Sequence, residues 1–478
     1  MPRKLLIAFG YAVSFYPVSA QHYTALNGSP FAGALAVHNN PAAHSAFNQS
    51  WDLTLGGFNL FVQKNNTVKI PFNLLKLFDE ETSVKVKEGI YSRYFREHNK
   101  VSLFNLIVRL KKNDYVAGGI NSRSYTQIHT SPISYVDTIS SSKGFMAMNQ
   151  NLSPLNGSGI TNNWVEGYVT YGRQLYSKGD FSLVGGLTVK LIRGSGGAYA
   201  QLQDAHITPF ADGSANQFEV TSATATYAVS RNLERIDKNS PKDVIINELL
   251  SGTKPSFGFD VGFELIRTIP ATRSGYYFYR DAAHYDFKLG ISVTDIGTLR
   301  YPSGIMTGTA RSIKSGVTGD VLDTKFNDIG YLEDFIDTVV TLFKVLIPAS
   351  SHIVLPLPTK LTINADKYLT RDFYINTQLV IPIVGSKWNT TKNVTEITHL
   401  IVTPRWDTRL AGVYLPLMVT SMGQVMPGIA VRAGPIVAGI HDLTRLGKSN
   451  DLDRGGYYIA LSFSPQLYSP KPNDCPSF

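Results

Sequence analysis

The sequence is poor in cysteine, in charge and in long hydrophobic runs. Its 478 residues include a single cysteine, Cys475, and only 17% charged residues. One cysteine excludes an intramolecular disulfide framework and a thiolate metal cluster. Few charges together with 11% aromatic residues argue against a disordered chain. Because the only long apolar stretch lies at the very N-terminus, a polytopic helical membrane protein is excluded as well.

That N-terminal stretch has the pattern of a signal peptide. Arg3 and Lys4 form a basic start, and residues 5–17 supply an apolar segment that is too short to span a bilayer comfortably. Val18-Ser19-Ala20 then gives the small-x-small pattern of a cleavage site. We expect residues 1–20 to be a signal peptide that is cleaved after Ala20, which predicts an exported protein.

Strict alternation of apolar and polar residues dominates the rest of the chain. In residues 285–294 one face holds Tyr285, Phe287, Leu289, Ile291 and Val293, and the other holds Asp286, Lys288, Gly290, Ser292 and Thr294. Residues 181–191 and 256–265 repeat the pattern. Alternation over about ten residues is typical of a strand that is apolar on one side and wet on the other.

A soluble sandwich and a membrane barrel both produce such strands, and strand length favours the barrel. A spanning strand needs about 9–11 residues, whereas soluble strands average about 5–6. The polar faces also carry charges at mid-strand, which suit a hydrated lumen: Lys190, Asp260, Glu264, Asp286 and Lys288. We therefore predict an all-β fold, a transmembrane antiparallel β-barrel of about 14 strands (12–16), in the outer membrane of a Gram-negative bacterium.

The predicted strands divide the mature chain into three parts. The candidate strands are residues 51–63, 101–110, 114–128, 164–176, 179–193, 197–206, 217–229, 256–266, 285–296, 359–367, 371–382, 397–406, 409–421, 427–441 and 455–464. Residues 21–50 precede them as an N-terminal hatch or plug segment, and the barrel occupies residues 51–464. Long loop insertions are expected at 129–163, 230–255 and 302–358. A proline-rich tail, 465–478, ends the chain.

Two of these insertions contain helical patterns. Ser240 and Pro241 resemble an N-cap and a first-turn proline of a short helix that runs to Leu250. In 302–358, apolar residues recur at helical spacing up to Pro348; those expected to dock a partner are Tyr331, Leu332, Phe335, Ile336, Val339 and Phe343. A helix that packs on its own barrel is the alternative.

Short motifs add a family resemblance. Asn39-Asn40-Pro41-Ala42-Ala43 lies just before the first predicted strand and resembles the Asn-Pro-Ala motif of the long-chain fatty-acid transporter superfamily. The resemblance implies that Asn39, Asn40, Pro41 and Ala42 belong to a hatch folded inside a 14-stranded barrel. Residues 293–297 and the C-terminal run 427–435 are similar to relatives that include the type IX secretion shuttle barrel. The strand-three kink and ligand-binding residues of the fatty-acid transporters are not found, and 302–358 is not their pattern.

Catalytic patterns are missing from the sequence. The ten histidines show no metal-binding spacing, and Gly194-Ser195-Gly196-Gly197 lacks the Lys-Ser/Thr that would make it a phosphate loop. No Gly-x-Ser-x-Gly motif is present. We expect no enzymatic activity, no catalytic residue, no metal, no cofactor and no nucleic-acid partner.

Two functions of different classes follow from this organisation. In the first, the long loops make the barrel a binding or adaptor component for a secreted or surface protein, or for a larger outer-membrane complex. In the alternative, the barrel transports hydrophobic or small solutes past the hatch, as the fatty-acid transporters do. A structural role in membrane integrity stays open beside them. The expected partners are outer-membrane lipid, lipopolysaccharide and a protein in the outer membrane or at the cell surface.

Overall fold

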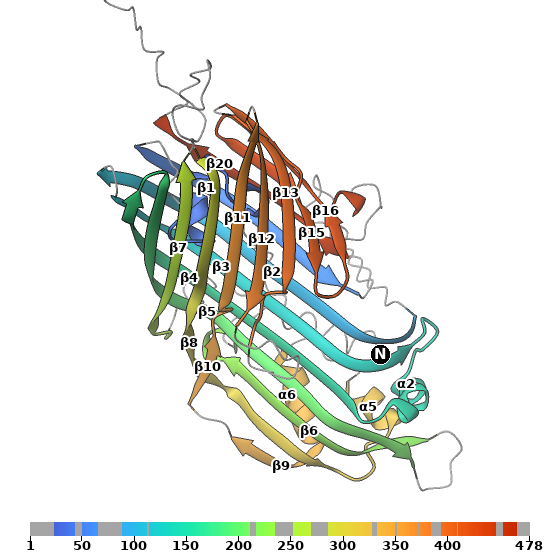
Figure 1. Cartoon of the computed structure of the whole chain (residues 1–478). Helices are drawn as coiled ribbons and strands as arrows, with labels where there is room; N and C mark the ends of the chain where they lie inside the picture. Colours follow the sequence, from blue (N-terminus) through green and yellow to red (C-terminus); the bar gives the residue numbers. More distant parts are fainter. Residues whose placement is uncertain are drawn as a thin grey trace, which may run out of the picture.

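The computed structural model describes thirteen stretches of the chain. They are residues 23–43, 50–65, 88–111, 114–210, 217–234, 252–268, 285–326, 332–348, 351–370, 372–383, 393–408, 410–445 and 453–465. Together they form a closed β-barrel that holds an N-terminal segment and continues at one end into a curved sheet (Figure 1).

Fourteen antiparallel strands close the barrel within the described part of the chain. In wall order they are β1 (Trp51–Lys64), β2 (Gly89–Lys111), β3 (Asp114–Tyr135), β4 (Leu155–Lys178), β5 (Phe181–Pro209), β7 (Pro255–Thr268), β8 (Tyr285–Ile313), β11 (Lys360–Thr370), β12 (Phe373–Pro382), β13 (His399–Asp407), the interrupted strand β14 (Ala411–Tyr414) with β15 (Leu417–Thr420), the interrupted strand β16 (Val425–Pro427) with β17 (Ile429–Ala433), β18 (Ile436–Ile440) and β20 (Tyr457–Phe463). The barrel closes where β20 pairs with β1, with Ile459 opposite Phe58. The short β19 (Arg454–Gly455) extends this seam.

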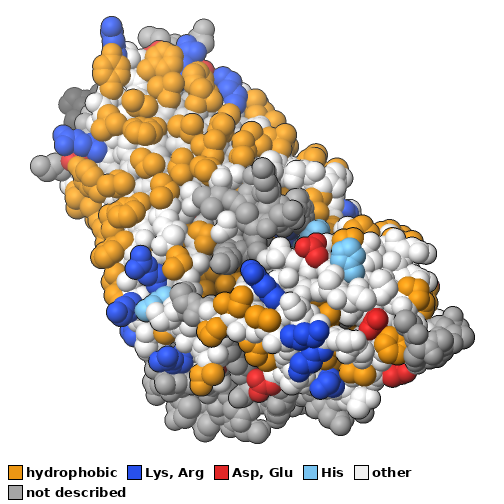
Figure 2. Space-filling model, turned by 90° about the horizontal axis from the view of Figure 1, so that it is seen from below, with side chains coloured by type: hydrophobic (Ala, Val, Ile, Leu, Met, Phe, Trp, Pro, Cys, Tyr) orange, Lys and Arg blue, Asp and Glu red, His pale blue; other side chains and the backbone are white. Residues whose placement is uncertain are grey.

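Side chains alternate across the barrel wall as the sequence predicts. Val189 and Phe259 lie opposite each other on β5 and β7 and are 41% and 44% exposed. Their polar neighbours Lys190 and Asp260 are buried on the inner face. Hydrophobic side chains cover the outer wall of the barrel in the space-filling view (Figure 2). An apolar outer band around a polar interior is the arrangement of a transmembrane barrel, so the predicted fold class is confirmed.

The two ends of the barrel differ in their connections. At one end the turns are short: two residues join β4 to β5, and two join β17 to β18. The first and last barrel strands also meet there, with Leu53 opposite Phe463. At the other end several strands continue far beyond the barrel (Figure 1). In outer-membrane barrels the short turns face the periplasm and the long connections face outward. We therefore call the two ends periplasmic and outer.

The outer extension is a sheet built by β2, β3, β4, β5 and β8 with three added strands. β6 (Phe218–Ser230) pairs with β5 and β8, while β9 (Phe343–Pro348) and β10 (His352–Pro356) pair with β8. Outside the hatch, the helical elements among the described residues are α2 (Ser142–Asn149), η3 (Gln150–Leu152), α3 (Arg231–Glu234), α5 (Gly319–Lys325), α6 (Leu332–Thr341) and η5 (Leu443–Arg445). Met146, Phe326 and Phe343 belong to the apolar cluster that joins α2 and the α5–β9 segment to this sheet.

The extension corrects the predicted loops. Much of 129–163 is strand, because β3 continues to Tyr135 and β4 starts at Leu155; β8 likewise continues to Ile313. These parts of the strands lack the strict apolar–polar alternation that identifies the barrel segments. Residues 179–193 and 197–206 form the single strand β5, and 427–441 is split by a turn at Gly434, whose φ is +56°.

The predicted helix of residues 331–346 is partly wrong. The helix α6 ends at Thr341, and Phe343 lies in β9, where the chain becomes extended and pairs with β8. Phe343 and the nearby β-branched Val345 and Ile347 suit a strand better than a helix. The predicted signal peptide, the helix at 240–250 and the tail after residue 465 lie outside the described residues. Among the described helices, none has the length and apolar character to cross a bilayer.

Candidate functional site

The N-terminal segment 23–43, here called the hatch, lies inside the barrel. It consists of two short 3-10 turns, η1 (Thr24–Leu26) and η2 (Gly33–His38), followed by the predicted motif. Ala34, Val37 and Ala42 are buried with the wall residues Tyr115, Tyr168 and Tyr285 in one cluster. The small side chains of the hatch let its backbone approach the wall closely. Residues 23–43 therefore pack against the inner face of the barrel wall.

Polar contacts fix the periplasmic side of the hatch to the wall. The Ser29 hydroxyl donates to Asp407 Oδ2 at 2.6 Å, and the Ala34 backbone N–H donates to Asp52 Oδ1 at 2.8 Å. The Lys288 ammonium donates to the Gly28 carbonyl oxygen at 2.8 Å. All of these contacts are non-covalent and charge-assisted, a class that is stronger than neutral hydrogen bonds.

Asn40 is the centre of the hatch motif. Its Nδ2 donates to the Phe263 carbonyl oxygen at 3.1 Å, and its Oδ1 accepts the Ala42 backbone N–H at 2.9 Å, which closes an Asx-type turn. The Ser292 hydroxyl donates to the carbonyl oxygen of Asn39 at 2.6 Å, and the Tyr115 hydroxyl donates to that of Pro41. The motif thus contacts three wall strands: its backbone carbonyls accept from β8 and β3, and the Asn40 amide donates to β7.

Three glycines on adjacent strands make room for this motif; we call them the glycine seat. A Cβ added to Gly186 would lie 2.4 Å from the Pro41 carbonyl, and one on Gly262 would lie 2.0 Å from Asn40 Oδ1. A Cβ on Gly290 would lie 2.9 Å from Asn40 Nδ2. Gly186 and Gly262 are register partners, so the seat is continuous across β5, β7 and β8. A side chain at any of these positions would meet the motif as it is now placed, most severely at Gly186, where the contact is with backbone.

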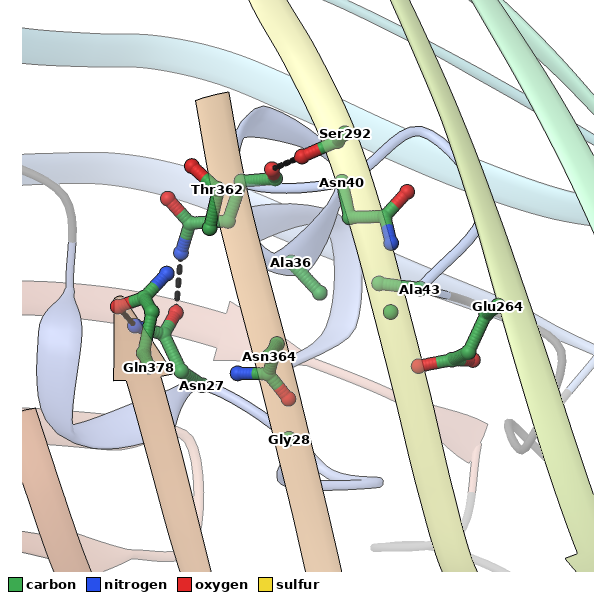
Figure 3. Close-up of a pocket in the computed structure, with 12 residues that line it drawn as sticks. Asn27, Gly28, Ala36, Asn40, Ala43, Glu264, Ser292, Thr362, Asn364 and Gln378 are labelled. Atoms are coloured by element: carbon green, nitrogen blue, oxygen red, sulfur yellow. Dashed lines mark hydrogen bonds between the residues drawn. The ribbon is translucent and has the colours of Figure 1, made fainter. Parts of the chain in front are cut away.

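Beside the seat, a small polar pocket lies between the hatch and the wall. Figure 3 shows Asn27 and Gln378 pointing toward one another on one side and Glu264 on the other. The lining is Asn27, Gly28, Ala36, Asn39, Asn40, Ala43, Glu264, Gly290, Ser292, Thr362, Asn364 and Gln378. Amides and hydroxyls dominate this lining, so the seam between the hatch and β8, β11 and β12 is hydrophilic.

On the outer side of the hatch, a network of buried charges crosses the lumen; we call it the charge belt. Lys190 Nζ lies 2.8 Å from Asp260 Oδ1 and 2.6 Å from Asp295 Oδ1. Arg123 binds both oxygens of Asp295, at 2.6 and 2.8 Å. Asp260 also accepts the Asp295 backbone N–H at 2.7 Å. These bonds join β3, β5, β7 and β8 across the inside of the barrel.

A second acidic centre extends the belt to the remaining wall. Glu396 lies 3.1 Å from Lys360 Nζ and 3.3 Å from His98 Nδ1, and it accepts the Tyr125 hydroxyl at 3.1 Å. Arg123 connects the two centres, because its other nitrogen donates to the same Tyr125 hydroxyl at 2.7 Å. Removing one partner from a buried pair is strongly destabilising. The belt therefore links strands on different sides of the lumen rigidly to one another.

A smaller cluster secures the periplasmic end. Arg405 donates to Asp366 at 2.6 Å and to the Gly28 carbonyl oxygen at 3.2 Å, so it joins the wall to the hatch. Asp407 pairs with Arg432 at 3.1 Å and accepts the Tyr414 hydroxyl at 2.8 Å. The hatch thus lies between two layers of paired charge.

The structure brings most of the predicted lumen charges together inside the barrel. Lys190 and Asp260 are in the belt, Lys288 holds the hatch, and Glu264 lines the pocket. Asp286 is not among these buried charges: its half-exposed carboxylate pairs with Arg267 and Lys367 at the rim. Tyr285, which the alternation places on the lipid face, is buried and donates to Asp366. The alternation is broken there by an irregular pairing between β7 and β8.

The predicted docking helix is only partly described. Tyr331 and the side chains of Leu332, Phe335 and Ile336 lie outside the described parts of the chain. Val339 packs against the apolar cluster of the extension, to which Phe343 also belongs. These two side chains therefore contact the chain itself.

Sequence reasoning missed Arg123, Asp295 and Glu396. Arg123 and Asp295 lie on predicted strands, but a local sequence pattern cannot predict an ion pair between two residues 172 positions apart. Asp295 has a φ of +60°, which is unusual for a residue other than glycine. Its position in a predicted strand gave no indication of this conformation.

His38, at the end of η2, is a buried titratable group of the hatch. Burial lowers the pKa of His38 well below its usual value, and the nearby cations Lys100, Lys190 and Arg123 lower it further. Its ring contacts Tyr168 edge-on, with ring centroids 4.8 Å apart. His38 is therefore neutral when the hatch is seated.

Comparisons with known proteins give one family match. A family model described as "Family of unknown function (DUF5723)" matches residues 41–440. Among curated proteins, none matches the chain. Within the described residues, no group of three or more His, Cys, Asp or Glu side chains could hold a metal ion.

Several solved barrels are similar over most of their length. A Pseudomonas aeruginosa FadL homologue is 11% identical, with 94% of this chain and 98% of that chain covered and a TM-score of 0.41. The TodX deltaS2S3 mutant monoaromatic hydrocarbon channel is 11% identical, with 91% and 94% covered and a TM-score of 0.42. The Ralstonia pickettii toluene transporter TbuX is 8% identical, with 90% and 92% covered and a TM-score of 0.38. Such identities transfer no residue role to this chain.

Proposed function

The chain belongs to the DUF5723 family, and we propose that it is an outer-membrane transporter of small solutes in which the hatch is the gate. The observation that supports this proposal is the placement of residues 23–43 inside the lumen. A barrel that served only as a rigid anchor would not need a separate segment fitted into a glycine seat. A segment held only by hydrogen bonds and side-chain packing can leave and return without breaking a covalent bond.

The contacts between the hatch and the wall are easier to separate on one side than on the other. Its motif packs tightly on Gly186, Gly262 and Gly290, whereas the adjoining seam toward β11 and β12 holds the polar pocket. Water can enter a polar seam and replace its hydrogen bonds, so separation there costs less than separation of an apolar interface. The path of the solute would follow this seam and then cross the charge belt.

Flux through reconstituted protein tests the proposal. Liposomes that contain the full chain should take up a small neutral solute such as arabinose slowly, because the hatch closes the lumen. The Gly262→Ala variant should take it up faster, since the added methyl group displaces Asn40. Gly167→Ala is the matched control, because a Cβ there meets nothing within 4 Å. Equal flux in all three proteins would contradict a gating hatch.

An adaptor function is the second candidate, and the strand β9 supports it. Within the described residues β9 pairs only with β8, and its side chains Val345, Leu346 and Ile347 are all more than 40% exposed. An exposed apolar edge strand invites pairing with another chain. If this strand docks a protein, native mass spectrometry of the barrel extracted from its own membrane should show a stoichiometric companion. A Leu346→Lys variant should lose that companion while arabinose flux stays unchanged.

A further inference from the structure

Three exposed cations lie where the apolar band of the barrel wall ends on the outer side. They are Arg193 on β5, Lys254 directly before β7, and Arg300 on β8; we call them the basic row. Next to them on the membrane side, Leu191 is 53% exposed and Phe257 is 61% exposed. Figure 2 shows Lys and Arg side chains along the border between the hydrophobic wall and the extension. The row therefore marks the level at which the hydrocarbon of the membrane ends.

Strand pairing places Arg193 beside Lys254. Arg193 is the register partner of Pro255, the first residue of β7. Its Nε also donates to Thr253 Oγ1 at 3.2 Å. Because Lys254 lies between these two contact residues in the chain, the guanidinium and the ammonium belong to one surface patch.

Arg300 joins this patch from the next strand. Gly258 of β7 pairs with Gly297 of β8, and Lys254 and Arg300 lie four and three residues beyond this pair in the same direction. The neighbouring Tyr301 is fully buried in the apolar cluster on the lumen side, so Arg300 faces outward. Adjacent strands are about 4.7–4.9 Å apart, so the row extends about 10 Å across β5, β7 and β8.

The row is a local patch and not part of a belt of cations around the rim. Val165 on β4 is the register partner of Arg193, and Val354 on β10 is the register partner of Arg300. Cations that only extend from the membrane surface into water can occur on any strand, but apolar residues flank this row on both sides. Among the described residues, none of the three cations forms an ion pair with a carboxylate.

Phosphate is the group that fits such a patch. A guanidinium binds phosphate oxygens through two parallel hydrogen bonds, and an ammonium adds a compact positive charge. Clusters of cations at the membrane surface bind anionic lipid headgroups. In the outer membrane of a Gram-negative bacterium, the outer leaflet holds lipopolysaccharide, whose lipid A carries phosphate groups directly above its acyl chains. Phosphates at this level would meet the basic row, and the acyl chains would meet the apolar wall.

We propose that Arg193, Lys254 and Arg300 form a docking site for the phosphate groups of lipopolysaccharide. The acyl chains of the bound lipid lie against the exposed apolar side chains of the same strands, which include Leu191 and Phe257. This site lies on the outer surface of the barrel, so it is independent of the hatch and of the proposed transport function.

Titration of lipid A into the detergent-solubilised full chain, followed by native mass spectrometry, tests the docking site. Arg300→Gln should weaken lipid A binding about fivefold, because one contact with phosphate is lost. The triple variant Arg193→Gln, Lys254→Gln, Arg300→Gln should weaken it about a hundredfold. All three side chains are exposed, so both variants should fold, which the mobility shift in SDS gels verifies.

A matched control removes the same charge from the opposite rim. Arg173, Lys178 and Lys367 are exposed cations near the periplasmic turns. Their combined replacement by glutamine should leave lipid A binding unchanged. Lipid A from which the phosphates have been removed should bind the unaltered protein at least about tenfold more weakly.

Three results would overturn the docking site. The first is equal lipid A binding by the unaltered protein and the triple variant of the row. The second is an equal loss in the control variant, which would assign binding to net charge alone. The third is binding of phosphatidylglycerol as tight as that of lipid A, which would make the row a surface for any anionic lipid. Arabinose flux should be the same in the triple variant and the unaltered protein, so none of these results bears on the gating proposal.

Discussion

Gly262 of the barrel wall lies directly against Asn40 of the hatch: a Cβ added to Gly262 would lie 2.0 Å from Asn40 Oδ1. The absence of a side chain at Gly262 leaves room for the buried Asn40 amide, although the two residues are 222 positions apart in the sequence. The hatch is therefore fitted to this wall, and the contacts of Asn40 should determine how firmly it is seated.

Replacing Asn40 should loosen the hatch selectively. Asn40→Ala removes the hydrogen bond to the Phe263 carbonyl and the turn to Ala42, which should cost about 1–3 kcal/mol because buried groups lose their partners. Hydrogen exchange of residues 23–43 should accelerate while exchange of the barrel strands stays slow. Asn156→Ala, at an exposed position of the outer extension, is the control. Unchanged exchange in the hatch would show that Asn40 does not hold it.

The charge belt should behave as one coupled unit. Lys190→Met leaves Asp260 and Asp295 without their shared cation and should destabilise the barrel by about 3–5 kcal/mol. Adding Asp260→Asn should recover part of this loss, because it removes the carboxylate that Lys190 neutralises, whereas Asp295 keeps its pair with Arg123. The temperature at which the protein changes its mobility in SDS gels measures both effects. Additive losses in the double variant would argue against coupling.

The hatch should loosen in acid through His38. Because the pKa of His38 is lowered in the folded chain, the neutral ring is favoured there, and stability is full above the unfolded pKa of about 6.5. As the pH falls below that value, protonation favours the released hatch by up to about 1.4 kcal/mol per pH unit. Hydrogen exchange of residues 23–43, corrected for intrinsic rates, should therefore rise between pH 7 and pH 5. His38→Asn should remove this dependence, and a pH response that persists in the variant would assign it to another group.

A charged residue in the apolar outer band should destabilise the folded barrel in lipid. Val189 lies at mid-strand between Val169 and Phe259, which are both exposed on the same face. Val189→Lys should reduce the free energy of folding into lipid vesicles by about 2–4 kcal/mol, as expected for lysine near the bilayer midplane. Ser222→Lys on β6 of the outer extension should have little effect. Guanidine titrations in vesicles compare the two, and equal effects would contradict the assigned membrane band.

The barrel was predictable because lipid and lumen impose a strict alternation, which residues 181–191 and 256–265 show clearly. The outer extension was predictable only in part: residues 197–206 and 217–229 are the outer part of β5 and the strand β6, as expected, whereas the outer parts of β3, β4 and β8 lack a clear alternation and were taken for loops. The hatch followed from a family resemblance at Asn40 and Pro41. The glycine seat and the belt pair Arg123–Asp295 depend on register across the closed barrel, which local sequence does not encode.

A reversible lock between the hatch and the wall tests the central claim most directly. With Cys475 replaced by serine, cysteines at Asn40 and Gly262 should form a disulfide, since a Cβ on Gly262 would lie 3.0 Å from Asn40 Cγ. Arabinose flux into liposomes should be blocked while the disulfide is intact and should rise when it is reduced. If flux is the same before and after reduction, the hatch is not the gate.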